Sequence, residues 1–306
     1  MSSNKMMKSL IILILTALTL TVYGENFSEG WKAVKDSGDK KKITEFLEKA
    51  SAAEADNPDY YALAGNHWWQ LAESLVISTK PPAGEDLSIR DQKTGEEVGS
   101  ISSAAMSDPA LRGKALGLIS EGARRFPERA DLVLGLANIQ KTMGKDAEAV
   151  ATLIGLLETA ATKKLKWTEN MELPSKAETF IPEAIQGYTA GLYEAESLVS
   201  GALCTKLCEA VIEAYPEHPY AYNIKAALAS AQGKPEDALK FLGIASEKAP
   251  DDPLILMNLG DALRNAGQKA KAKAAYKKVL ITEDADESLK REARKLVEDL
   301  SEKGTQ

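Results

Sequence analysis

The sequence predicts an all-α protein in which helix–turn–helix pairs stack into a solenoid. The main observation is a 34-residue unit that occurs twice in register in residues 219–284, where Gly233 recurs as Gly267 and Ala238 recurs as Ala272. A period near 34 is typical of helix pairs that cannot bury their apolar face alone and must stack on neighbouring pairs. The chain has only two cysteines, which argues against a disulfide framework, so stacked helices must supply the stability.

The first 24 residues are expected to form a secretory signal peptide. Lys5 and Lys8 precede an apolar run from Leu10 to Leu20, and Gly24 offers a small residue for cleavage. The run is about a dozen residues long, whereas a spanning helix needs roughly 20, which favours cleavage over an uncleaved anchor. We therefore expect an exported chain, periplasmic or secreted, without stable insertion in a membrane.

The charge of the mature chain argues against nucleic acid as a partner. Loss of two lysines with the signal peptide changes the formal net charge from −7 to −9. An acidic surface repels phosphate backbones and, for the same reason, anionic lipid headgroups. A local basic patch would be the exception.

The same period, carried backwards from its clear copies, predicts about six helix pairs over residues 25–302. The first and fourth copies are degenerate, and the second, third, fifth and sixth begin near Pro58, Ala130, Pro219 and Pro253. A polar amphipathic helix over 286–301 is expected to cap the open end, followed by a tail at 303–306.

Two insertions interrupt the array. Residues 164–182 are expected to form a surface loop. Residues 80–108 contain two alternating segments, 87–89 and 98–101, on either side of a glycine-containing turn, which predicts a small β-hairpin. Because an isolated hairpin is marginally stable, we expect its apolar side to pack on the helices around Trp68 and Trp69.

The spacing of small residues resembles the tetratricopeptide repeat family, most clearly in the copies that begin at Pro219 and Pro253. In that family the two helices of a pair cross where large side chains would hold the backbones apart. Leu192 and Trp31 depart from this pattern in the fourth and first copies. The resemblance implies that the helices cross at four pairs of residues: Gly65/Ala115, Ala137/Ala149, Ala226/Ala238 and Gly260/Ala272.

The resemblance also implies a binding surface, because peptide partners of this family usually lie along the concave face made by the first helix of each pair. The chain lacks the lysines of the family's carboxylate clamp, which argues against binding of chaperone tails. The partner-binding residues that the resemblance implies are Asn66, Trp69, Asn138, Lys141, Met257, Asp261 and Arg264.

Cys204 and Cys208 are four residues apart on a predicted helix and therefore share one face. They occupy inward repeat positions, where free cysteine behaves as a small hydrophobe. A strained or regulatory disulfide and a metal or redox site are the alternatives, although two thiols alone do not complete a zinc site.

The sequence carries no recognisable catalytic motif. It has only two histidines, and it has no nucleophile elbow, phosphate-binding glycine loop or His-Glu metalloprotease pattern. We therefore expect no enzyme activity and no cofactor. The sequence favours a non-catalytic adaptor of the bacterial cell envelope that binds a protein or peptide along the concave groove; the alternative is capture of a small ligand or metal as a transport accessory.

Overall fold

The computed structural model describes residues 27–78, 87–90, 94, 96–168, 172–195 and 197–302. The expected signal peptide and the C-terminal tail lie outside these residues. The chain divides into two compact units, Met1–Leu136 with Thr168–Met171 and Ala137–Trp167 with Glu172–Gln306, and each is described by itself.

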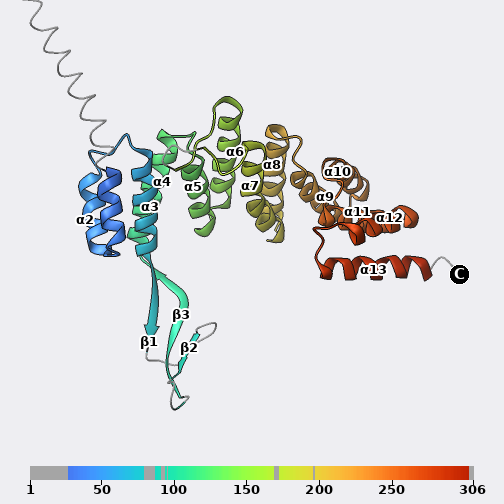
Figure 1. Cartoon of the computed structure of the whole chain (residues 1–306), viewed down its shortest axis with the longest axis horizontal. Coiled ribbons are helices and arrows are strands. Elements are labelled where there is room, and N and C mark those ends of the chain that lie inside the picture. The colour runs from blue at the N-terminus through green and yellow to red at the C-terminus, as the bar shows by residue number, and fades with distance from the viewer. Residues whose placement is uncertain are drawn as a thin grey trace, which may run out of the picture. The chain divides into compact units, whose positions relative to one another are not determined.

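The first unit consists of antiparallel helix pairs and a small sheet (Figure 1). Its helices are 27–36, α2 (Lys40–Ala50), α3 (Pro58–Ala72), α4 (Pro109–Arg125) and the first part of α5 (Ala130–Thr142). Asp39 caps α2 by accepting hydrogen bonds from two backbone N–H groups, and Asp108 caps α4 in the same way. These short acidic caps fix where each helix begins.

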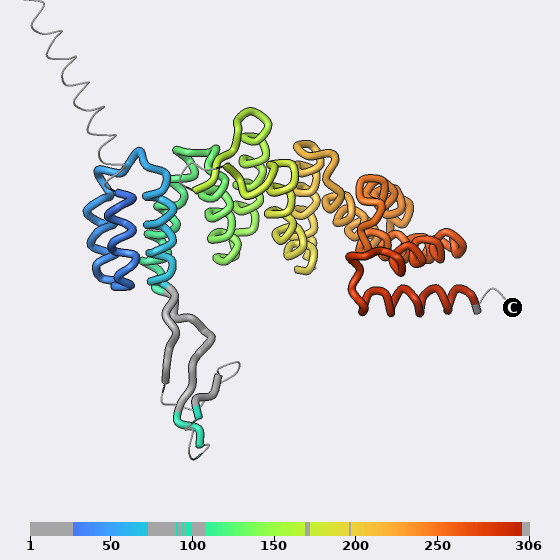
Figure 2. The backbone as a smooth tube through the Cα atoms, in the orientation of Figure 1, coloured from blue at the N-terminus to red at the C-terminus, as the bar shows by residue number. Residues whose placement is uncertain are grey.

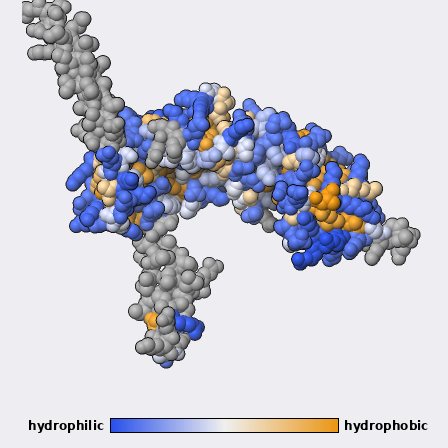
Figure 3. All heavy atoms as spheres, in the orientation of Figure 1, coloured by the Kyte–Doolittle hydropathy of each residue, from blue (hydrophilic) through white to orange (hydrophobic). Residues whose placement is uncertain are grey.

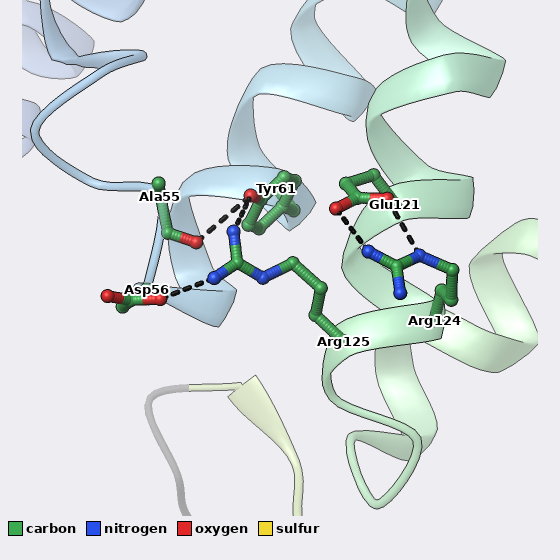
Figure 4. Close-up of polar contacts among 6 residues, drawn as sticks. All are labelled: Ala55, Asp56, Tyr61, Glu121, Arg124 and Arg125. Atoms are coloured by element: carbon green, nitrogen blue, oxygen red, sulfur yellow. Dashed lines mark hydrogen bonds and ion pairs between the residues drawn. The ribbon is translucent and has the colours of Figure 1, made fainter.

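Polar contacts join the end of α4 to the start of α3 (Figure 4). The Tyr61 hydroxyl donates to the carbonyl of Ala55 at 3.0 Å, and Arg125 Nη1 donates to the same hydroxyl at 3.1 Å. Arg125 also forms an ion pair with Asp56. The Tyr61 ring is buried, so these bonds satisfy its hydroxyl while the ring fills the core.

The insertion forms a three-stranded antiparallel sheet, one strand more than the expected hairpin. Its strands are β1 (Glu73–Ser78), β2 (Leu87–Arg90) and β3 (Glu97–Ser107), in the order β1-β3-β2. β1 continues directly from α3, and the Asp108 N–H donates to the carbonyl of Ala72 at 3.1 Å, which closes the base of the sheet. Val98 is one of the apolar residues of the expected hairpin that should pack on the helices. It is 51% exposed, so this expectation is wrong for Val98.

The second unit is a row of antiparallel helices whose backbone path can be followed in Figure 2. After the last part of α5 its helices are α6 (Asp146–Thr162), α7 (Ala177–Glu194), α8 (Leu198–Ala214), α9 (Tyr220–Ala231), α10 (Pro235–Lys248), α11 (Pro253–Asn265), α12 (Lys269–Ile281) and α13 (Glu287–Glu302). α7 begins inside the expected loop 164–182. Gly144, Gly233 and Gly267 lie in the turns with φ of 71°, 70° and 75°, which L side chains rarely adopt.

All eight predicted crossing residues are buried. Two of them, Gly65 and Gly260, face a large side chain that lies four residues, or one helical turn, after the predicted partner. A Cβ at Gly65 would lie 2.3 Å from Ile119, and one at Gly260 would lie 2.3 Å from Tyr276. Glycine is therefore required where the facing residue is large.

The degenerate fourth copy reverses this size relationship. Leu192 stands at the position that Gly65 and Gly260 take in other copies, and it is buried. The facing position, which Ile119 and Tyr276 take in those copies, is taken in the fourth copy by the smaller Cys208. The helix-pair fold class predicted from the sequence is confirmed. Within the described residues there are six helix pairs, and α13 packs Leu289, Leu296 and Leu300 against the core of the last pair.

Candidate functional site

In the first unit the predicted binding residues are Asn66 and Trp69. Asn66 is exposed. Trp69 is partly buried, and the Arg112 guanidinium lies 5.2 Å from the centre of its ring. A cation over the face of a tryptophan is an attractive contact that occupies one side of the ring.

In the second unit Asn138 and Lys141 are exposed on α5. Lys141 Nζ lies 3.4 Å from the carbonyl of Gly187 and 5.2 Å from the centre of the Tyr188 ring, so it contacts α7. Burial raises the pKa of Tyr188 to about 12. The amine and the neutral phenol therefore form a structural contact between α5 and α7.

The structure brings Asp261 and Arg264 together on α11, where their side chains form an ion pair at 3.0 Å. Asp261 also accepts a hydrogen bond from the buried Tyr276 at 2.8 Å. Met257, by contrast, is 4% exposed and belongs to the core between α11, α12 and α13. Because Met257 packs in this core, it has almost no surface to offer a partner.

A groove that the sequence did not reveal lies between the ends of α7 and α9 and the start of α8. It has a volume of about 640 Å³. We call it the α8 groove, and its lining residues are Tyr193, Glu194, Ser197, Leu198, Gly201, Ala202, Thr205, Leu228, Ala231 and Gln232.

Exposed apolar side chains stand at this groove. Leu198 is 96% exposed and Tyr193 is 36% exposed, and the adjacent Val199 is 71% exposed. Apart from its chain neighbours and the backbone of its own helix, nothing lies within 4 Å of the position where a Cβ of Gly201 would be, so the space beside it is open. Figure 3 shows that most of the visible surface is hydrophilic, as is usual for a protein that exposes few large apolar groups.

The local sequence explains why these residues are exposed. Val199 occupies the repeat position at which Gly144, Gly233 and Gly267 form the turn in other copies. Without that glycine α8 begins about one turn earlier in the repeat than α10 and α12, and Ser197 caps it by accepting from the Ser200 N–H at 3.0 Å. The extra turn carries Leu198 and Val199. The missing turn glycine is the signal that could have located the groove.

The two cysteines are free and have no exposed surface. Cys204 Sγ donates to the carbonyl of Thr189 at 3.2 Å, and the hydrogen bond between the two thiols together with burial raises the pKa of Cys208. These features fit the interpretation of Cys204 and Cys208 as small apolar residues of the core. Within the described residues, no group of three or more His, Cys, Asp or Glu side chains is placed to hold a metal ion.

The aromatic cluster of α3 is packed between helices. His67 is buried, and its Nε2 lies 2.8 Å from Thr44 Oγ1 of α2. Lys114 Nζ of α4 lies 3.4 Å from the centre of the Trp68 ring and 3.1 Å from Glu48. Burial, followed by the charges of Lys40 and Lys114, lowers the pKa of His67. Trp68 and His67 therefore join α2, α3 and α4.

None of the helices in the described part of the chain is both long and apolar enough to cross a membrane. A search of curated proteins found no match.

Among solved structures, MamA (residues 41 to the end) from Desulfovibrio magneticus RS-1 is 15% identical over 58% of this chain and 88% of its own, with a TM-score of 0.38. A tetratricopeptide repeat protein from Thermus thermophilus, TTC0263, is 16% identical over 61% and 91%, with a TM-score of 0.39. A tetratricopeptide repeat protein from Parabacteroides merdae ATCC 43184 is 15% identical over 87% and 82%, with a TM-score of 0.41.

A model of the tetratricopeptide repeat family matches residues 229–291. This range runs from the end of α9 through α10, α11 and α12 into α13. It contains the turn glycines Gly233 and Gly267 and the crossing pair Gly260 and Ala272. Over residues 229–291 the chain is therefore similar to the tetratricopeptide repeat family.

Proposed function

We propose that this chain is a non-catalytic adaptor of the bacterial cell envelope that binds a segment of another protein in the α8 groove. The observation that carries the proposal is the exposure of Leu198 and Val199 beside a groove of about 640 Å³. Two adjacent, largely exposed apolar side chains on a helix have no role in the core of their own unit. Covering each of them would contribute roughly 1.5–3 kcal/mol before the costs of association.

The position of the groove in the repeat supports the same function. Repeat positions are counted from Pro219 in the fifth copy and from the residue 34 places earlier in the fourth. Tyr193 and Ser197 then take positions 9 and 13 of the fourth copy, and Ala231 takes position 13 of the fifth. These belong to the concave-face positions that the resemblance implies for partner binding. The groove adds to them the exposed first turn of α8.

The test is site-specific photo-crosslinking in envelope extract. A photoreactive residue at Thr205 lines the groove, and one at the exposed Lys240 on α10 is the control. We expect a defined adduct from position 205 only, and its partner is then identified and purified. Equal adducts from both positions would contradict the proposal.

Affinity for the purified partner provides the second part of the test. We expect L198S/V199S to weaken binding at least tenfold, because that ratio corresponds to only about 1.4 kcal/mol. L254S/I281S is the matched control, since Leu254 and Ile281 are also exposed apolar residues of the second unit. Unchanged affinity in L198S/V199S would refute the role of the groove.

Export is a separate part of the proposal and has its own measurement. Expression with residues 1–24 present should give a periplasmic chain whose mass corresponds to cleavage after Gly24. An uncleaved chain in the cytosolic fraction would contradict the envelope location. It would not bear on partner binding in the α8 groove, which the crosslinking and affinity measurements test. Capture of a small ligand, the alternative, gains no support from the α3 aromatic cluster, because cations of α4 lie against Trp68 and Trp69.

A further inference from the structure

The solvent-facing side of α12 carries a concentration of positive charge in an acidic chain. Its sequence, KAKAKAAYKKVLI, contains five lysines and no acidic residue. The chain as a whole has a formal net charge of −7. We call this surface the lysine face, and its residues are Lys269, Ala270, Lys271, Lys273, Ala274, Lys277, Lys278 and Ile281.

Helical geometry divides α12 into two sides. Ala272, Ala275, Tyr276 and Val279 form the buried side, which packs in the core of the last repeat. With 3.6 residues per turn, Ala270, Ala274 and Ile281 lie near the centre of the opposite side. Ile281 is 82% exposed.

The lysines flank this small and apolar strip. Lys269 and Lys273 lie along one side of it, Lys271 and Lys278 along the other, and Lys277 lies close to its middle, by the same helical spacing. In this arrangement the methylene groups of the lysine side chains can lie along the apolar strip while their ammonium groups remain in solvent.

The positive charges are not balanced within the molecule. In the described part of the chain, Lys269, Lys271, Lys277 and Lys278 form no ion pair, and Lys273 bonds to the neutral hydroxyl of Ser301 at 2.7 Å. Like charges four residues apart on a helix, as at Lys269, Lys273 and Lys277, repel one another. The face therefore costs stability in the free protein, and an anionic partner would relieve that repulsion.

We propose that the lysine face binds the surface of an anionic phospholipid bilayer. The face belongs to a single helix and presents alanines beside the lysines, so it offers a shallow surface rather than a pocket. Lysine is a flexible point charge that suits a layer of mobile headgroups, whereas fixed phosphate or carboxylate groups are usually held by bidentate arginine. Ile281 supplies an apolar group that inserts at the boundary between headgroups and acyl chains.

The acidity of the rest of the chain does not prevent this contact. Charges more than about 8 Å away are largely screened at physiological ionic strength. Glu283 and Asp284 follow Ile281 and limit the face at that end. α13, which packs against the buried side of α12, carries five acidic and four basic residues, so the charge that it adds is nearly balanced. Binding is accordingly peripheral and reversible, and it weakens as salt increases.

The test is co-sedimentation of the full chain with vesicles of phosphatidylcholine, with and without phosphatidylglycerol. Binding should require phosphatidylglycerol and decrease with salt. Each lysine near an anionic surface contributes about fivefold in affinity, so K271Q/K277Q/K278Q should bind about a hundredfold more weakly. I281S should weaken binding without changing its dependence on salt.

The control removes the same charge elsewhere. Lys41, Lys49 and Lys240 are exposed lysines outside α12, and K41Q/K49Q/K240Q should bind nearly as well as the wild type. If both triple variants lost the same affinity for the vesicles, the binding would depend only on the net charge of the protein, and the proposal would be overturned. Binding to phosphatidylcholine alone would also overturn it, as would binding to soluble polyglutamate without binding to vesicles, since the latter would indicate an acidic protein as the partner.

Discussion

Replacing Gly260 by alanine should destabilise the second unit, although alanine is the better helix former. The new Cβ would lie 2.3 Å from Cε1 of Tyr276, 2.7 Å from its Cδ1 and 2.8 Å from its Cζ. Carbon atoms pack at roughly 3.5–4.0 Å, so the ring would have to move by about 1 Å or more. Tyr276 has no exposed surface in which to move.

Three effects determine the magnitude. Alanine in place of a helical glycine contributes about 1 kcal/mol to stability. Overpacking costs about 1–3 kcal/mol. Displacement of the ring also breaks the hydrogen bond from Tyr276 to the Asp261 carboxylate, now 2.8 Å long, at a cost of about 1.5–3 kcal/mol. The free energy of unfolding should therefore fall by about 1.5–5 kcal/mol in G260A.

The chain offers a matched control and a rescue. Apart from the chain neighbours of Gly243 and the backbone of α10, nothing lies within 4 Å of the position that a Cβ would take there, so G243A should stabilise the protein by about 0.5–1 kcal/mol. The preceding copy places Ala226 and Leu242 at the corresponding positions within one core cluster. G260A/Y276L reproduces that pair, and we expect it to recover at least about 1 kcal/mol relative to the sum of the two single changes.

The assay is chemical unfolding followed by far-ultraviolet circular dichroism on the full chain and the four variants, with Y276L included. The reasoning depends on contact between position 260 and the Tyr276 ring. If G260A were as stable as G243A, or if the two changes at 260 and 276 were simply additive, that reasoning would be refuted.

Three further predictions concern other parts of the molecule. Burial lowers the pKa of both histidines, His67 and His218, so the unfolded chain binds more protons below about pH 6.5 and the free energy of unfolding should fall as pH decreases from 7 to 5. H67Q should reduce this slope measured by urea unfolding, and an unchanged slope would count against burial of His67. Native Cys204 and Cys208 should react with a thiol reagent much more slowly than the unfolded chain, and equally fast labelling would contradict their burial. Replacing residues 74–106 by a short glycine linker should leave the helices folded, because Ala72 and Asp108 are hydrogen-bonded neighbours, and a large loss of helical circular dichroism would show that the sheet is needed for folding.

The regular part of the fold could be predicted because its signals are local and repeated. A turn glycine such as Gly233 specifies a backbone conformation with positive φ, and Ala238 specifies a close helix crossing, whatever the rest of the chain does. The fixed period then places each copy. The same logic located the capping helix from its single apolar stripe.

The errors arose where the outcome depends on neighbours. Val76 and Ile77 form an apolar run that fits a strand or a buried helix equally well, and pairing with β3 decided for a strand. Met257 occupies a repeat position that the resemblance assigns to the binding face, but its packing in the core of the last helix pair buries it. Periodicity gives the direction of a side chain on its own helix and does not say what covers it.

The sequence by itself determined the helix pairs, their turns and the small residues at their crossings, because these follow from backbone conformation and close packing within one 34-residue unit. Only the tertiary structure decided which surfaces remain open. The exposure of Leu198 depends on an extra turn of α8 beside α7 and α9, and the separation of the α12 lysines from acidic partners depends on what packs around that helix. Exposure is a property of all the elements around a residue, so it emerges only when they are assembled.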